Sequence, residues 1–486
     1  MLDNRESQVR WSYFSTFSTA GMQLLAAATI TRFLQPKDFG LAAMAMVCYG
    51  LTGYFTQLGM GRAIVQKPGL TPGNIRAAFT LSLATGLGGF IIACALSPLL
   101  AVYYKEPRLT WVLIVFSLNL IFQSLSMVSG GLLRREFRIR DQAICDFIGY
   151  VISTFALGLP MAIKGYGVWA LVVSNVSMPL IVAVAYFIAR PHSVLPTFHR
   201  ASYRHITAFG SKATFVTAVE ALGGSIDTLM LGRLVSPAAL GLYNRSLTLS
   251  VMPVFNLSLG LSRVFHPAIA RAAENALSEC KRMLQTTELQ LMAIIIPTCV
   301  GAAIAARTIV PAVFGRQWAG AIPVYQALCI VAALDATFHL PGIQLEVLSL
   351  FRRKTYIQVS FVLSWVLTIL MTARYGITVV ALARVALEVI RTLFIHALSA
   401  RSLHASLWSL VRTWLPGIGC SAVVGAVIYV LQTSFAHAHG VRLGLQLLLL
   451  VLAGLLTAVL TYRVVYRSSV YDPWIRLFHQ RAVVVE

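Results

Sequence analysis

Charged residues are scarce in this sequence of 486 residues. Only 12% are Asp, Glu, Lys or Arg, whereas 58% are hydrophobic. Soluble domains carry about 25% charged residues, and a soluble chain of this length folds as two or three domains that each need a polar surface. The charge present is too small to coat such surfaces. Lipid must therefore cover the outside, and the sequence predicts an integral membrane protein.

Acidic residues are the scarcer kind, since 17 Asp and Glu oppose 39 Lys and Arg, for a formal net charge of +22. A nucleic-acid-binding protein gathers its basic residues in one patch. Here they stand in short clusters between long apolar runs, which is typical of the loops that orient membrane helices. The pattern argues against nucleic acid as a partner.

Motifs for covalent or nucleotide chemistry are also missing. The sequence contains no glycine-rich phosphate-binding loop, no metal-ligand cluster and no nucleophile–base pair at a usable spacing. The seven cysteines form no CxxC pair, and most lie in apolar segments, where cysteine acts as a small hydrophobic residue. We therefore expect a transporter rather than an enzyme, with no metal and no bound cofactor.

Long apolar segments fill most of the chain. A bilayer core of about 30 Å needs about 20 helical residues. Taking the N-terminus as cytoplasmic puts 26 Lys and Arg on that side and 10 on the other, which predicts both termini in the cytoplasm and an even number of spans. The 14 candidate spans are 13–34, 39–61, 77–102, 110–133, 142–163, 167–189, 208–232, 239–262, 287–306, 322–349, 356–373, 378–400, 414–433 and 443–462.

The sequence repeats itself at an offset of 201 residues. RFLQPKDFGL (32–41) aligns with RLVSPAALGL (233–242), and LGMGR (58–62) aligns with LGLSR (259–263). The repeat unit contains six spans, and six crossings return the chain to its starting side, so the two lobes must be parallel. We predict an all-α polytopic membrane protein with three parts: an N-terminal lobe (1–200), a C-terminal lobe (201–402) and an additional helix pair with a cytoplasmic tail (403–486).

Ionisable residues inside the spans are the first candidate functional residues, because each costs roughly 2.5–3.5 kcal/mol at a helix centre and needs a partner or a wet cavity. Glu220 and Asp227 lie seven residues apart on one face of the seventh span. They either bind a coupling cation, H⁺ or Na⁺, or form internal salt bridges. A polar stripe on the first span includes Thr19 and Gln23, which either contact substrate between the lobes or pack against another helix.

The twelfth span places Arg384, Glu388 and Arg391 on one helical face. Glu388 neutralises one arginine, and the remaining positive charge suits an anionic ligand because guanidinium binds phosphate oxygens in a fork. The alternative is a structural network with acids such as Asp335. We take Arg384, Arg391 and Arg245, which lies inside the eighth span, as candidate substrate-binding residues. Glu388 and Asp335 join the candidate coupling residues.

Two local patterns predict further features. Asp335, His339 and Glu346 share a face of the tenth span, and the intervening Pro341 and Gly342 predict a broken helix that lines a transport site. In the cytoplasmic loop 263–286, apolar residues at helical spacing stand beside basic ones, which predicts an interfacial helix.

Five stretches of the chain carry a family resemblance: TRFLQPKDFGLAAMAM (31–46), LGMGRAIVQKPGLT (58–71), GGLLRREFRIRD (130–141), GYGVWALV (165–172) and LGLYNRSLTLSVMPVFNLSLGLSRVFHPAIAR (240–271). They resemble Wzx-type polysaccharide flippases, which belong to the multidrug, oligosaccharidyl-lipid and polysaccharide exporter superfamily. The resemblance covers about residues 5–400. That family usually has 12 spans, although members with 14 exist.

The resemblance implies a flippase of the bacterial inner membrane, which moves an undecaprenyl-diphosphate-linked oligosaccharide between leaflets by alternating access. The product would serve lipopolysaccharide or exopolysaccharide export, with a polysaccharide polymerase and export machinery as partners. Two alternatives stay open. A cation-coupled drug antiporter of the same fold favours acids over arginines in its cavity, and a membrane glycosyltransferase or polymerase needs a long outer loop with paired acids.

Overall fold

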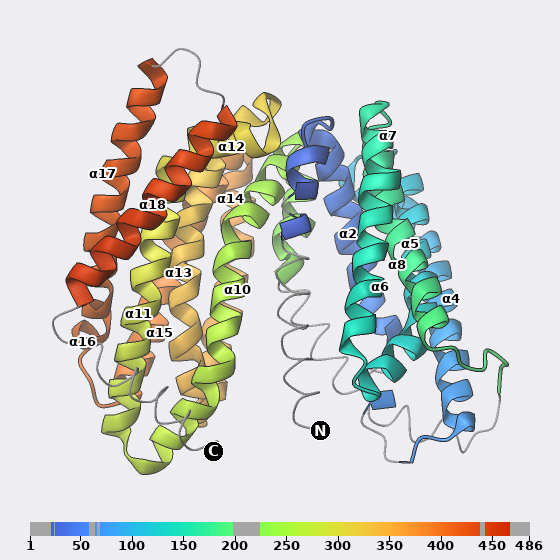
Figure 1. The fold of residues 1–486 in the computed structure, drawn as a ribbon, viewed down its shortest axis with the longest axis horizontal. Helices are drawn as coiled ribbons and strands as arrows, with labels where there is room; N and C mark the ends of the chain where they lie inside the picture. Colours follow the sequence, from blue (N-terminus) through green and yellow to red (C-terminus); the bar gives the residue numbers. More distant parts are fainter. Residues whose placement is uncertain are drawn as a thin grey trace. The chain divides into compact units, whose positions relative to one another are not determined.

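The computed structural model describes residues 21–23, 25–57, 64–65, 69–197, 224–437 and 443–466, and within these residues the chain is helical, with short connections (Figure 1). Two candidate residues of the sequence, Thr19 and Glu220, lie outside the described residues. The chain divides into two compact units: unit 1 is 1–244 with 313–317, and unit 2 is 245–312 with 318–486. The predicted lobes 1–200 and 201–402 stay a prediction.

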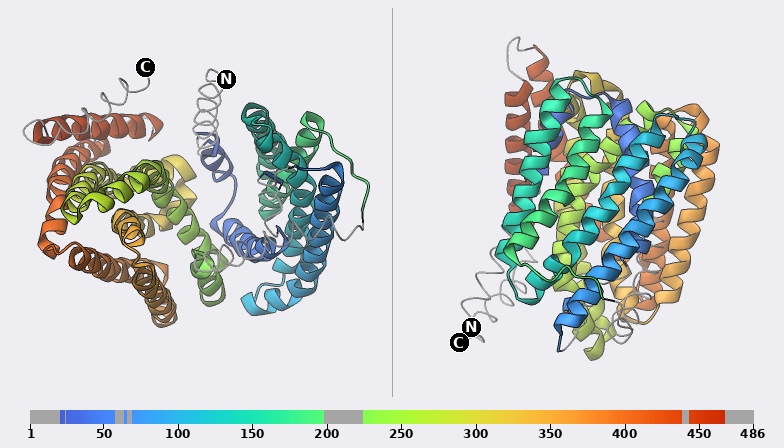
Figure 2. Two further views of the ribbon diagram at one scale, coloured as in Figure 1. Left: turned by 90° about the horizontal axis from the view of Figure 1, so that it is seen from below. Right: turned by 90° about the vertical axis from the view of Figure 1, so that its right-hand side faces the viewer.

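Unit 1 is built from long helices that run alongside one another, as the blue and green ribbons of Figure 2 show. Thr71 begins α4 as its N-cap, where its hydroxyl accepts a hydrogen bond from the Asn74 amide, and Pro72 occupies the first turn. The helices are α2 (Pro36–Gln57), α4 (Pro72–Tyr104), α5 (Leu109–Arg135), α6 (Ile139–Val151), the π-helix η1 (Ile152–Gly158), α7 (Leu159–Ile163), α8 (Val168–Ala189) and the start of α10 (Pro237–Asn275).

The two copies of the repeated motif contact each other within unit 1. A Cβ atom on Gly40 would overlap the carbonyl oxygen of Pro237, and a Cβ atom on Gly241 would overlap the carbonyl oxygen of Pro36. The contact is therefore reciprocal, as in an isologous interface between two like surfaces. Only glycine permits this approach of the N-terminal turns of α2 and α10, which gives the aligned glycines of the repeat a steric reason.

Unit 2 contains the remaining helices. Three of its long helices, α11, α13 and α15, bury polar side chains among apolar ones. The buried polar side chains include Glu288, Gln344, Glu388 and His396. The helices are α11 (Leu277–Ile304), α12 (Ala306–Phe314, whose end belongs to unit 1), η2 (Arg316–Ala321), α13 (Ile322–Val347), α14 (Phe351–Thr372), η3 (Ala373–Tyr375), α15 (Ile377–Ser402), α16 (Leu407–Val411), η4 (Arg412–Trp414), α17 (Leu415–His437) and α18 (Leu443–Tyr466).

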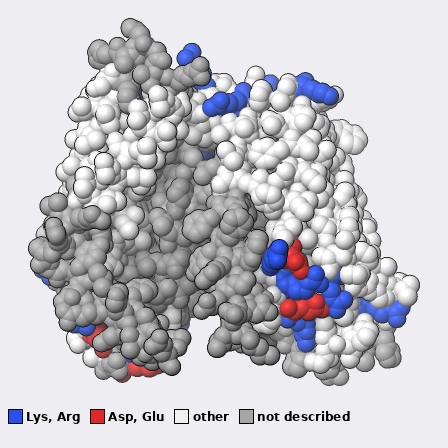
Figure 3. Space-filling model, in the orientation of Figure 1, with Lys and Arg blue, Asp and Glu red and all other residues white. Residues whose placement is uncertain are grey.

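The helices have the length and surface that a bilayer requires. Eight of those in the described residues are long and apolar enough to cross a membrane. Large apolar side chains such as Val102 and Ile188 are exposed on their flanks. In Figure 3 most of the described surface is uncharged, with Lys and Arg at its top and both signs of charge in its lower part. The protein is a multi-pass membrane protein, while the count of 14 spans stays a prediction.

The predicted break in the tenth span is wrong. The helix α13 is continuous from Ile322 to Val347, with Pro341 in its interior. Pro341 and Gly342 are both buried. Proline is tolerated at such a place because neighbouring helices compensate the lost backbone hydrogen bond.

The predicted interfacial helix at 263–286 is also wrong. The helix α10 extends to Asn275 and α11 begins at Leu277, with Ala276 in an extended conformation between them. Ile269 and Leu284 are fully buried. The apolar face that suggested a membrane-surface helix instead packs inside the protein as an extension of two long helices.

Candidate functional site

Four charged side chains meet between α13 and α15, and we call them the arginine cluster: Asp335, Arg384, Glu388 and Arg391. Arg391 forms ion pairs with Asp335 and, one turn back along α15, with Glu388. Arg384 Nε lies 3.6 Å from Glu388 Oε2. The spacing predicted from the sequence thus places three of these groups on one face, and α13 supplies the fourth.

Aromatic rings surround the two guanidinium groups. Arg391 Cζ lies 4.3 Å from the ring centroid of Phe338 and 4.5 Å from that of Phe361. Arg384 Cζ lies 4.8 Å from the centroid of Phe361 and 4.7 Å from that of Trp365. A cation over an aromatic face is attracted by the ring quadrupole, most strongly where water is excluded. The rings therefore stabilise both guanidinium groups at a depth where contact with lipid would be unfavourable.

The formal charge of the arginine cluster is zero, because two guanidinium groups face two carboxylates. The positive surplus expected from the sequence is not found in these four residues, since Asp335 supplies a second acid. The members differ in access. Glu388 is fully buried and the Arg391 side chain is 5% exposed, whereas the Asp335 side chain is 39% exposed. Asp335 is thus the partner of Arg391 that can most easily leave.

A cavity of about 300 Å³ adjoins the cluster between α14 and α15. Arg391 lines it together with hydroxyl groups and aromatic rings. Gln358 on α14 also reaches Arg391, accepting from Nη1 at 3.4 Å. Among the residues that line the cavity, Arg391 carries the charge and Tyr356, Ser360 and Ser364 add hydroxyl groups. The cavity therefore offers one guanidinium to an anion within a largely apolar wall. The apolar members of the lining are Ile357, Phe361, Leu387, Ile390 and Phe394.

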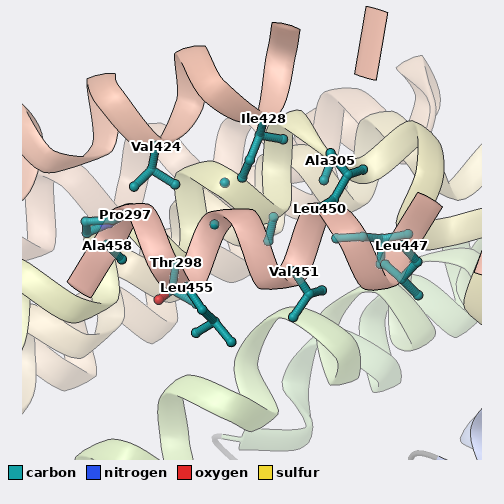
Figure 4. A pocket seen from close by; sticks show the side chains of 14 residues that line it. Pro297, Thr298, Ala305, Val424, Ile428, Leu447, Leu450, Val451, Leu455 and Ala458 are labelled. Carbon is teal, nitrogen blue, oxygen red and sulfur yellow. The ribbon is translucent and has the colours of Figure 1, made fainter. Parts of the chain in front are cut away.

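A second cavity, of about 180 Å³, lies among α11, α17 and α18 and is almost wholly apolar (Figure 4). Figure 4 shows lining side chains from α18, among them Leu450, Val451 and Leu455, and from α17, among them Val424 and Ile428. Such a lining offers hydrogen bonds to almost no ligand and accommodates hydrocarbon.

The other predicted residues lie elsewhere. Asp227 belongs to unit 1, where it is nearly buried and accepts a hydrogen bond of 2.9 Å from the Tyr243 hydroxyl. Gln23 is exposed in the helical segment near the start of the described residues, and Arg245 is half-buried on α10. Glu346 forms an ion pair with Lys354. The structure therefore brings together Arg384, Glu388, Arg391 and Asp335, and places Asp227 and Gln23 in the other unit.

One buried polar site was missed by the sequence analysis. Glu288 of α11 and His396 of α15 are both fully buried, and His396 Nε2 lies 2.6 Å from Glu288 Oε1. Each lies near an end of its predicted span, where an ionisable residue is expected to reach the membrane surface, so neither was selected as a candidate. In the described residues, no group of three or more His, Cys, Asp or Glu is placed to hold a metal ion.

A helical bundle of this hydropathy, with buried charges beside cavities in its membrane helices, defines the class of the protein as a membrane transporter. A family model described as "Polysaccharide biosynthesis protein" matches residues 29–323, more than half of the chain. The chain belongs to this polysaccharide biosynthesis protein family. The resemblance to Wzx-type flippases is thereby confirmed.

Relatives and solved structures agree with this assignment. The lipopolysaccharide biosynthesis protein WzxC of Escherichia coli (strain K12) is 25% identical over 364 residues, 73% of this chain and 71% of WzxC. The teichuronic acid biosynthesis protein TuaB of Bacillus subtilis (strain 168) is 21% identical over 339 residues, 69% of this chain and 70% of TuaB. The structure of the lipid II flippase MurJ in an inward closed conformation matches with a TM-score of 0.73 at 13% identity, covering 94% of this chain and 99% of MurJ. At that identity the likeness shows the fold.

Proposed function

We propose that this protein moves a polyprenyl-diphosphate-linked oligosaccharide from the cytoplasmic to the periplasmic leaflet of the bacterial inner membrane, by alternating access. The observation that carries the proposal is membership of the polysaccharide biosynthesis family, with WzxC and TuaB as relatives. The MurJ-like fold supports it, because MurJ is a lipid II flippase. The protein makes and breaks no covalent bond of its substrate in this scheme.

The diphosphate would bind by competing with Asp335 for Arg391. A phosphate accepts a bidentate hydrogen bond from guanidinium as a carboxylate does, so the exchange preserves the contact. Asp335 is the more exposed of the two acids, and its departure leaves the cluster one positive charge in excess. An ion pair that opens for an anion and closes behind it suits a transporter, which must release what it binds.

The lipid chain would use the apolar cavity of α11, α17 and α18. Its lining is hydrocarbon apart from Thr298, and exposed leucines of α18 continue the apolar surface beside it. Both termini face the cytoplasm in this proposal, following the bias of Lys and Arg. A polysaccharide polymerase and export machinery would take up the product on the periplasmic side.

The proposal is tested in cells by the sidedness of the lipid-linked pool. Deleting the gene should leave lipid-linked repeat units on the cytoplasmic leaflet, inaccessible to a periplasmic ligase or lectin, and restoring the gene should release them. An unchanged pool with altered drug tolerance would instead favour the cation-coupled antiporter. A pool that disappears, because repeat units are no longer made, would favour the glycosyltransferase.

A further inference from the structure

The ion pair formed by Glu288 and His396 links two helices in the interior of unit 2. Both residues are fully buried, and the pair joins α11 to α15 over 108 positions of sequence. Trp414 of η4 donates its indole N–H to the same Glu288 Oε1 at 2.9 Å. Among the described residues, the other carboxylate oxygen, Oε2, is buried without a hydrogen-bond partner. Burying an acid this way is costly unless its charge is compensated.

The position of the imidazole protons follows from geometry. His396 Nδ1 lies 2.8 Å from the Thr392 carbonyl oxygen, which can only accept, so Nδ1 carries a proton. His396 Nε2 lies 2.6 Å from Glu288 Oε1. Two lone pairs would repel at that distance, so one further proton must lie between nitrogen and oxygen. The structure therefore corresponds to a pair that holds one exchangeable proton and has no net charge.

Loss of that proton would destabilise the pair. Whichever imidazole nitrogen keeps the remaining proton, the other nitrogen turns a lone pair toward an acceptor, either Glu288 Oε1 or the Thr392 carbonyl oxygen. A net negative charge also remains in an apolar interior. The pair must then open or admit water, so release of the proton favours a rearrangement of the helices that hold it.

The helix α15 connects the pair to the arginine cluster. Glu388, Thr392 and His396 follow one another at intervals of four residues on one face, so Glu388 and His396 are about 12 Å apart along the axis. Thr392 also lies beside Arg391 in sequence, and its hydroxyl contacts that of Thr337 on α13 at 3.4 Å. Because one helix carries both residues, a displacement of α15 at His396 also displaces Arg391.

Other titratable groups on the surrounding elements are engaged elsewhere. Asp335 pairs with Arg391, Glu346 pairs with Lys354, and Arg412 is exposed. Within the described residues, the ion pair that His396 makes is with Glu288. The titratable and charged residues on the elements around α11 and α15 are Tyr325, Cys329, Asp335, His339 and Glu346 of α13, Arg352, Arg353, Lys354 and Tyr356 of α14, Arg374 and Tyr375 of η3, Arg412 of η4, Cys420, Tyr429 and His437 of α17, and Tyr462, Arg463 and Tyr466 of α18. Besides the pair itself, those of α11 and α15 are Glu279, Cys280, Lys281, Arg282, Cys299, Arg384, Glu388, Arg391 and Arg401.

We propose that Glu288 and His396 form a proton-binding site that couples proton movement to transport, an inference that rests on the proposed function. One proton enters the pair from one side of the membrane and leaves to the other side as α15 moves. With one proton exchanged for each substrate, a pH gradient of about one unit shifts the steady-state ratio of substrate between leaflets by up to about tenfold.

Reconstituted vesicles with a trapped pH indicator test the coupling. Wild type should move protons when a gradient of polyprenyl-diphosphate-linked oligosaccharide is imposed. The E288Q and H396Q variants should equilibrate the lipid between leaflets without moving protons. The ratio of lipid between the two leaflets should then not depend on the pH gradient. The matched control is E279Q, which removes an exposed carboxylate of the same helix α11 and should behave as wild type. Proton movement by E288Q equal to that of wild type would overturn the inference.

Failure of the site and failure of the proposed function are distinguishable. Lipid movement by wild type without proton movement would remove the proton site and leave the flippase intact. If wild type moves no lipid, infrared difference spectra of the purified protein against pH decide the site alone. One pH-dependent band, of the Glu288 carboxyl group or of the proton it shares with His396, should be present in wild type and E279Q and missing from E288Q, whereas a band of the buried Glu388 persists in all three. A spectrum of E288Q identical to that of wild type would overturn the site whatever the substrate.

Discussion

At the scale of a residue, Arg391 contributes both to the stability of a buried charge network and to the proposed binding of substrate. Its guanidinium satisfies two carboxylates and lies over two rings. Removing one partner of a buried ion pair costs about 3–5 kcal/mol, because the remaining charge is uncompensated. Loss of transport in a single variant would therefore not separate a binding role from a folding role.

We expect R391A to lower both thermal stability and lipid transport, and R391M/D335N to regain most of the stability but not the transport. The double variant removes one charge of each sign, so the cluster stays formally neutral and Glu388 keeps Arg384 as its partner. Melting temperature in detergent and lipid movement in vesicles are the two measurements. Full transport by the stable double variant would show that Arg391 serves structure alone.

Gly40 and Gly241 offer a second prediction for single residues. Overpacking a tight contact costs about 1–3 kcal/mol, and here the obstacle is backbone, which yields less than a side chain. G40V and G241V should each lower the melting temperature, whereas G88V, where a Cβ meets nothing within 4 Å on α4, should change it little. Equal stability of all three variants would mean that the reciprocal contact is not formed.

The charged cluster and the buried pair differ in how visible they are in the sequence. Arg384, Glu388 and Arg391 share a helix, so their spacing alone predicts a common face. Glu288 and His396 are brought together because α11 and α15 both pack against α13, which no local pattern reveals. The free-energy cost of burying an ionisable residue in lipid identifies residues at the centre of a predicted span. It gives no signal for residues near the ends of a span.

At the scale of elements, hydrophobic length predicted most helices, because a bilayer fixes how many apolar residues a span needs. Continuity was predicted less well. Pro341 suggested a break in α13 that packing prevents, and the amphipathic stretch around Ile269 suggested a separate helix where α10 simply continues. Local sequence records propensity, and neighbouring helices decide whether that propensity is realised.

The helix α18 carries a prediction about the apolar cavity. A Cβ atom on Gly454 would lie 3.4 Å from Ile428 Cδ1, an ordinary contact, so G454L directs a side chain into the cavity without a backbone clash. We expect G454L to reduce lipid transport several-fold while V459L, an exposed position of the same helix, does not. Initial rates in vesicles provide the comparison. Unchanged transport by G454L at wild-type stability would show that the lipid chain does not use this cavity.

At the scale of the whole molecule, the distribution of basic residues predicts orientation. Fusions of a cytoplasmic fluorescent reporter to either terminus should both fluoresce, and periplasmic phosphatase fusions at the same ends should be inactive. One active phosphatase fusion would require an odd number of spans and would contradict the predicted count of 14.

The central claim is that this helical bundle carries a phosphorylated, lipid-anchored headgroup through the bilayer. The most direct measurement uses purified protein in vesicles with a labelled polyprenyl-diphosphate oligosaccharide and an impermeant reagent that destroys label in the outer leaflet. The account predicts that wild-type protein makes nearly all of the label accessible, whereas protein-free vesicles protect about half. Protection unchanged by wild-type protein that is folded and correctly inserted would contradict it.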